Sequence, residues 1–244
     1  MTFPRRRAFV GRFRGGRSGV PALLHDRSGS PAIEFALVAP IMFTILAGSY
    51  DVTQIFIAMR QVTSTAQEIV QIATEQAVQP DQSNALTVQQ AYQAMTAIYA
   101  MIPRLKTGAD TSAFSVTLSA VVFTASPAGC TAGSNCTYDG KIAWSIWLPR
   151  GLQVVRPCGA VTQVMPDQQA TLSSLPTGGM TTLTSVMVAD VSYGYQPLFS
   201  GFVTGPVTLR RTAFLPPRAG TPDKYVQYDR DNAGSNSAIC PGYI

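Results

Sequence analysis

Histidine is almost absent from this chain of 244 residues, and the only one, His25, lies near the N-terminus. A Ser-His-Asp or Cys-His catalytic centre requires a histidine beside its nucleophile, so the sequence beyond residue 25 cannot supply one. Asp139, Asp167 and Asp190 lack the spacing of metal ligands. No glycine-rich motif that could hold a phosphate is present either. We therefore predict a protein that is not an enzyme and that has no metal site and no cofactor.

Charge is also scarce, at 13% of the residues, and it is unevenly distributed. Residues 1–33 contain seven arginines and one acidic residue, whereas residues 60–244 contain eleven basic and ten acidic residues. The formal net charge of +5 therefore comes from the N-terminal segment. No cluster of cations interleaved with aromatic residues occurs in the rest of the chain, so we predict no binding to nucleic acid.

A long stretch without charge, from Phe35 to Tyr50, follows the basic segment, and its apolar character continues further. About 20 apolar residues suffice to cross a bilayer, so we predict one transmembrane helix over residues 30–60, bent at Pro40. Asp51 is expected near the outer interface or against a partner helix. The positive-inside rule places the arginine-rich N-terminus in the cytoplasm and the later residues outside.

Three interpretations of this N-terminal region are open. It could be a plain signal anchor, with Glu34 at the membrane edge, or a cleaved secretory signal with an apolar region at 35–46 and a cut near 47–49. The third interpretation is a prepilin. It rests on the segment Gly29-Ser30-Pro31-Ala32-Ile33-Glu34-Phe35, in which a basic leader ends in glycine and Glu-Phe follows after four residues.

The segment resembles the TadE-like pseudopilins of the tight-adherence (Tad, or Flp) pilus system, which share Gly-x4-Glu-[Tyr/Phe]. The matching residues are Gly29, Glu34 and Phe35. The resemblance implies cleavage between Gly29 and Ser30 by a prepilin peptidase. It also implies that Glu34 and Phe35 act in assembly, where the Glu34 carboxylate pairs with the new N-terminal amine of a neighbouring subunit and sets the register.

The resemblance further implies a location in the bacterial inner membrane, with the C-terminal domain in the periplasm or outside the cell. The implied partners are the peptidase, other pilins or pseudopilins, the inner-membrane secretion platform and the lipid bilayer. The function would be that of a minor, non-catalytic component of pilus assembly and adhesion. The alternative is a signal-anchored exoplasmic binding module that does not assemble, which substitution of Glu34 would distinguish.

The predicted fold is α+β, with a helix that extends from the membrane into an exoplasmic domain containing an antiparallel sheet, as in type IV pilins. We divide the chain into a cytoplasmic, cleaved leader (1–29), the membrane helix (30–60), exoplasmic helices (61–103) and a β-rich domain (104–244). An apolar stripe in the first exoplasmic helix predicts packing on the chain's own sheet or on partner subunits: Val62, Ala66, Ile69, Val70, Ala73.

Local signals predict the elements that follow. Thr87 and Gln90 have capping-box spacing for a second helix that ends before Pro103. Alternating apolar residues predict strands at 114–120, 183–196 (one long strand or a bent pair) and 207–215. Another candidate strand places four apolar residues on one face: Ile142, Trp144, Ile146, Leu148.

All four cysteines, Cys130, Cys136, Cys158 and Cys240, follow the membrane segment. Zinc binding is the competing interpretation, but the sequence has no Cys-x-x-Cys pair and no histidine after His25. An even number of cysteines on one side of a membrane favours disulfide bonds in an oxidising compartment. Three pairings are possible, and the sequence does not choose among them.

Overall fold

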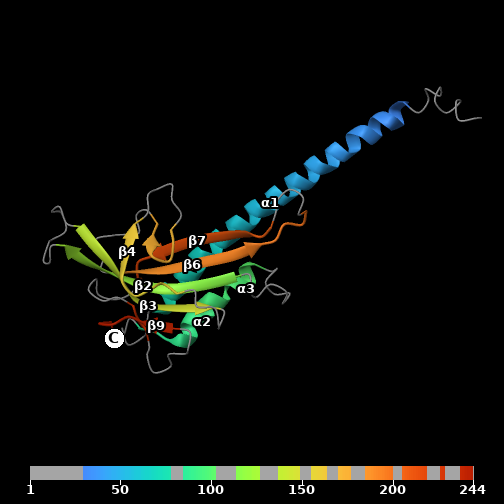
Figure 1. Ribbon diagram of the computed structural model, residues 1–244. Coiled ribbons are helices and arrows are strands. Elements are labelled where there is room, and N and C mark those ends of the chain that lie inside the picture. Colours follow the sequence, from blue (N-terminus) through green and yellow to red (C-terminus); the bar gives the residue numbers. More distant parts are fainter. Residues whose placement is uncertain are drawn as a thin grey trace, which may run out of the picture. The chain divides into compact units, whose positions relative to one another are not determined.

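The computed structural model describes residues 30–77, 85–102, 114–126, 137–148, 155–163, 170–176, 185–199, 205–218, 226–228 and 237–243 (Figure 1). The chain forms two units, residues 1–47 and residues 48–244. Helix α1 (Ser30–Gln76) is a single helix of 47 residues whose sequence runs from the first unit into the second. A long apolar helix followed by a sheet-rich domain confirms the predicted α+β class.

Two short helices follow α1. Strand β1 (Ala85–Leu86) leads into α2 (Val88–Thr96) and α3 (Ile98–Met101). The predicted capping box is confirmed: the Gln90 backbone N–H donates to Thr87 Oγ1 at 3.2 Å, and the Thr87 N–H donates to Gln90 Oε1 at 2.9 Å. The predicted second helix is therefore correctly started, but it is divided into two segments at Ala97.

The larger sheet has the strand order β5-β4-β3-β2-β6-β7, and β9 also pairs with β3. All of its pairs are antiparallel except β4–β5, and a separate parallel pair joins β1 to β8. The strands are β2 (Phe114–Ser126), β3 (Thr137–Leu148), β4 (Ala160–Gln163), β5 (Ser174–Leu175), β6 (Ser185–Tyr195), β7 (Val207–Leu215), β8 (Gln227–Tyr228) and β9 (Ser237–Ile239).

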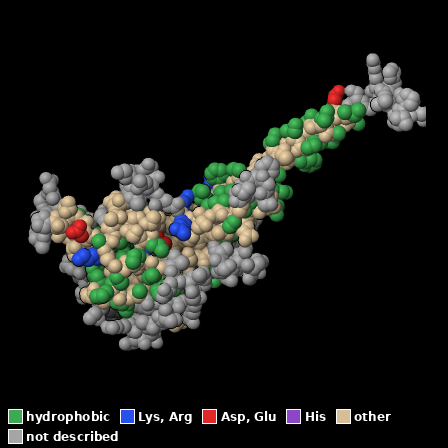
Figure 2. Space-filling view, in the orientation of Figure 1, with side chains coloured by type: hydrophobic (Ala, Val, Ile, Leu, Met, Phe, Trp, Pro, Cys, Tyr) green, Lys and Arg blue, Asp and Glu red, His purple; other side chains and the backbone are tan. Residues whose placement is uncertain are grey.

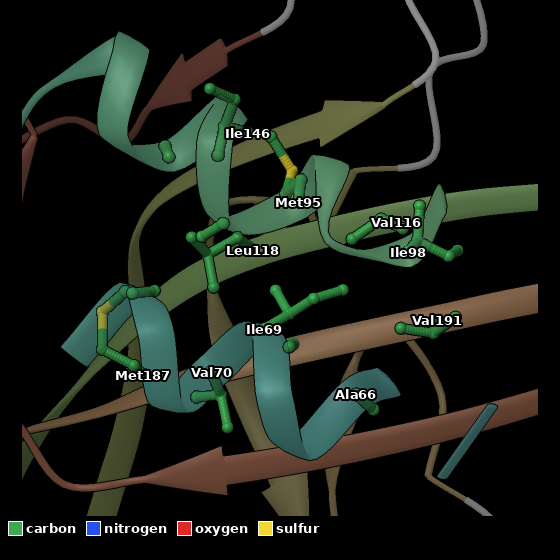
Figure 3. Close-up of a cluster of buried hydrophobic side chains, with 14 of the residues drawn as sticks. Ala66, Ile69, Val70, Met95, Ile98, Val116, Leu118, Ile146, Met187 and Val191 are labelled. Atoms are coloured by element: carbon green, nitrogen blue, oxygen red, sulfur yellow. The ribbon is translucent and has the colours of Figure 1, made fainter. Parts of the chain in front are cut away.

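The main core lies between one face of this sheet and the helices (Figure 3). The apolar stripe of α1 is buried there, which confirms packing on the chain's own sheet: Val62, Ala66, Ile69, Val70, Ala73. The short helices contribute Met95 and Ile98, and strand β6 contributes the alternating residues that its pattern predicts. Full burial of a large aliphatic side chain contributes about 1.5–3 kcal/mol, so this layer is the principal source of stability.

One register irregularity corrects the prediction for β3. Val121 pairs with Ile142 and Ala120 pairs with Trp144, so Ala143 is an extra residue on β3. A bulge of this kind reverses the alternation of side chains. Consequently Trp144 and Ile146 face the helices, whereas Ile142 belongs to a smaller core on the opposite face of the sheet.

The C-terminal segment is bound to the edge of β3. Strand β4 pairs with Gly140 and Lys141, and β9 pairs with the residues beyond the bulge. A disulfide joins Cys158, just before β4, to Cys240, just after β9. Burial raises the pKa of the nearby Tyr243 phenol above its ordinary value of 10.0.

Candidate functional site

The N-terminal part of α1 exposes an unusual amount of apolar surface. Its most hydrophobic window of 18 residues has a mean hydropathy of 1.8, and none of that window is buried, unlike a core helix of a soluble domain. Figure 2 shows hydrophobic side chains along this part of the helix. The large exposed apolar residues are Ile33, Phe35, Leu37, Val38, Ile41, Met42, Phe43, Ile45, Leu46, Tyr50, Val52, Phe56 and Ile57. This helix is long and apolar enough to serve as a membrane anchor.

Hydroxyl groups in this segment are satisfied by the helix itself. Thr44 Oγ1 lies 2.9 Å from the Pro40 carbonyl oxygen and 2.7 Å from that of Ile41, and it donates to these acceptors. Thr53 Oγ1 donates to the Ser49 carbonyl at 2.8 Å. Polar groups inside a bilayer need partners within the protein, so these local hydrogen bonds make the threonines compatible with lipid.

Asp51 is different, because its carboxylate is fully buried within the second unit. The backbone N–H groups of Leu198 and Phe199 donate to its two oxygens, each at 3.1 Å. The rings of Tyr50 and Phe199 meet edge to face, with centroids 6.2 Å apart. These contacts come from the segment after β6, so the chain itself supplies hydrogen-bond donors to both oxygens of Asp51. No local pattern in the sequence predicts the contact of Asp51 with Leu198 and Phe199.

The remaining predicted site residues are placed as follows. Glu34 and Phe35 are exposed in the first turns of α1, Ser30 is its first residue, and Gly29 lies outside the described residues. Cys158 and Cys240 are bonded to each other, whereas Cys130 and Cys136 lie outside the described residues. The structure therefore brings Glu34 and Phe35 to one helix end and puts the observed disulfide at the edge of the sheet.

A second polar feature lies on the sheet face opposite the helices. The buried Arg156 guanidinium donates through Nε and Nη2 to the two oxygens of Asp190, at 2.6 and 2.8 Å. Its Nη1 donates to the Ser174 carbonyl, and the Thr212 hydroxyl donates to Asp190. The adjoining cavity has a volume of only about 110 Å³. Because the charges neutralise each other and are well hydrogen-bonded, this network is a structural element of the sheet.

Metal-binding chemistry has no visible basis in the described part of the chain, where no three His, Cys, Asp or Glu side chains gather. His25 and Asp167 lie outside the described residues, and Asp190 is engaged by Arg156. The candidate functional site is therefore the exposed apolar part of α1 together with the Glu34 carboxylate near its start.

Comparison with known proteins gives one result for this helix. The model of the family described as TadE-like protein matches residues 29–71, which include Glu34, Phe35 and the first part of the helix that packs on the sheet. No curated protein and no solved structure matches the chain. The TadE-like family is associated with the Tad pilus. Residues 29–71 of the chain are thus similar to the TadE-like family, and the resemblance predicted from the N-terminal motif is confirmed over this segment.

Proposed function

We propose that this protein is a minor, non-catalytic pseudopilin of a Tad-type pilus. It is held in the bacterial inner membrane by α1, with the N-terminus in the cytoplasm and the sheet domain in the periplasm or outside. A prepilin peptidase removes residues 1–29, and the mature chain then assembles with other pilins or pseudopilins at the secretion platform, in an arrangement like that of type IV pilins.

The observation that carries this proposal is the change of environment along α1 within the matched segment. Large apolar side chains are exposed from Ile33 to Ile57, and the buried stripe that packs on the sheet begins at Ala58. One helix thus contains both an apolar segment that can face lipid or neighbouring helices and a segment that packs on the folded domain. These two environments along one helix suit a subunit that is extracted from a membrane and packed into an assembly through its helix.

Glu34 supplies the register in this mechanism. A carboxylate close to an apolar helix segment is costly to bury alone, but it is tolerable when a cation pairs with it. Cleavage before Ser30 creates an amine at the helix start of every subunit. Pairing of that amine with Glu34 of a neighbour favours one axial offset over the others.

The first test is the N-terminus of the mature protein. The chain is isolated from the membrane fraction, and its intact mass and terminal sequence are measured. We expect a chain that begins at Ser30. Gly29→Ala should leave the leader attached, whereas Gly19→Ala, a matched change inside the leader, should leave the cut unchanged.

Two other results would contradict the proposal. A chain that begins near Ser49 would be a secreted domain without its anchor. An intact leader in the native membrane would make α1 a plain signal anchor. Either result removes the amine that the register mechanism requires.

A further inference from the structure

Exposed large apolar side chains have a restricted distribution in the described residues. Apart from those on α1 between Ile33 and Ile57, they are Leu198 and Phe199, with exposed fractions of 68% and 42%. Both lie directly after β6, in the segment that contacts Asp51. The other large apolar side chains of the described sheet domain are buried or half-buried, so Leu198 and Phe199 form a distinct exposed apolar patch.

The patch is fixed to α1 through backbone groups. The two N–H groups of this segment occupy both oxygens of Asp51, and the Phe199 ring packs on Tyr50. Hydrogen bonds to a charged acceptor are among the stronger ones in proteins. Because backbone groups make the attachment, the Leu198 side chain stays mostly exposed, and the Phe199 ring stays partly exposed beside Tyr50.

The attachment point lies near the end of the predicted membrane crossing. The predicted transmembrane helix covers residues 30–60, and about 20 apolar residues suffice to cross a bilayer, so Asp51 is expected near the outer interface. At the same end of the domain, Gln54, Gln61, Tyr193 and Tyr195 line a cavity of about 250 Å³ between α1 and the end of β6. Leu198 and Phe199, which contact α1 at Asp51, are therefore expected near the outer end of the predicted membrane helix.

We propose that Leu198 and Phe199 insert into the outer interface of the phospholipid bilayer as a second membrane contact. This inference rests on the proposed function, in that α1 must span the membrane. Its occupant is lipid because Phe199 packs on Tyr50, which with Val52 belongs to the exposed apolar surface of α1, and because Leu and Phe are suited to the headgroup–acyl boundary. The contact holds the domain at a defined depth and tilt on the membrane, and Asp51 is the residue that fastens it.

The test uses the full chain in phosphatidylcholine vesicles whose acyl chains are brominated, since bromine quenches tryptophan on contact. Phe199→Trp reports on the patch, and Phe43→Trp reports on the spanning helix. Gln163→Trp is the control, because β4 pairs with β3 at the end of the sheet far from Tyr195. The native Trp144 and Trp147 are buried, and the parent chain supplies their background.

We expect brominated lipid to reduce the added emission of Phe199→Trp and Phe43→Trp, and to leave that of Gln163→Trp unchanged. Asp51→Ala in the Phe199→Trp chain should weaken the quenching, because the segment is no longer fastened. Quenching at residue 43 without quenching at 199 would overturn the lipid contact and leave the anchor intact. A blue-shifted but unquenched Phe199→Trp would assign the patch to a protein partner and also overturn it. Loss of quenching at both positions would overturn the anchor itself.

Discussion

At the scale of single residues, the buried ion pair of Arg156 and Asp190 is the feature of the sheet domain whose disruption should cost the most stability. The Arg156 side chain has no exposed surface, and that of Asp190 is 12% exposed. Removing one partner from a buried pair leaves the other charge uncompensated, at a cost of about 3–5 kcal/mol. We therefore expect Asp190→Ala to lower the free energy of unfolding by about this amount, measured by urea denaturation of the chain in detergent.

A surface pair on the same chain supplies the control. Arg218 Nη1 lies 2.7 Å from Glu75 Oε1, and the two side chains are 53% and 48% exposed, respectively. Exposed pairs contribute about 0–1 kcal/mol, so Glu75→Ala should be nearly neutral. The double change Arg156→Met with Asp190→Leu should recover much of the stability lost in Asp190→Ala, because no charge is then left buried. Equal effects of Asp190→Ala and Glu75→Ala would show that the buried pair has no special role.

The sequence predicts part of this arrangement. Alternation along β6 places Asp190 on the face opposite Ala189 and Val191, and the structure has it there. The ion-pair partner of Asp190 is not predictable, because Arg156 is 34 residues away from it in sequence and lies in an irregular segment with no local pattern. The contact of Asp51 with Leu198, 147 residues apart, is hidden from sequence reasoning for the same reason.

At the scale of elements, helices and strands that are specified by neighbouring residues are predicted correctly, whereas irregularities that depend on tertiary pairing are not. The α1 stripe, the Thr87–Gln90 cap and strand β7 agree with the structure because each is specified by neighbouring residues. The extra residue Ala143 is invisible in the alternation of β3, since its place depends on the register with β2. Because of this extra residue, Ile142 lies in the smaller core on the opposite face of the sheet from Trp144.

The disulfide of Cys158 and Cys240 is an element-scale constraint, because it joins the ends of two strands that share one edge of β3. It closes a long loop, with a sequence separation of 82 residues. On the chain-entropy model such a bridge contributes about 4 kcal/mol. We expect the double variant Cys158→Ser, Cys240→Ser to unfold at lower urea concentration than the oxidised parent, with earlier proteolysis of the segment around β9.

The reduced parent chain is the control for this experiment. Its unfolding midpoint should fall at least to that of the double variant, since reduction opens the same bridge without changing the sequence. An unchanged midpoint and an unchanged proteolytic pattern in the double variant would show that the pairing of β9 with β3 holds the C-terminal segment without the bridge.

At the scale of the whole molecule, the proposed function assigns assembly to the N-terminal part of α1, which contains Glu34. It lies 24 positions before Ala58, where the buried stripe of α1 begins, so its substitution should leave the domain's fold unchanged. Glu34→Gln keeps the size of the side chain and removes the charge that the proposed register mechanism requires. We expect normal membrane levels of the processed chain but loss of pilus-dependent surface adherence, measured on cells that carry only the variant.

The matched control is Glu68→Gln, an exposed glutamate on the same helix in the part that packs on the sheet. It should adhere like the parent, because the register pair is untouched. Normal adherence of Glu34→Gln, with the chain correctly processed, would assign the protein to the class of anchored binding modules that do not assemble. Loss of adherence together with loss of the chain from the membrane would show that Glu34 acts on insertion or stability. The register mechanism therefore requires one specific combination: a processed, membrane-bound Glu34→Gln chain in cells without adherence, beside a fully active Glu68→Gln.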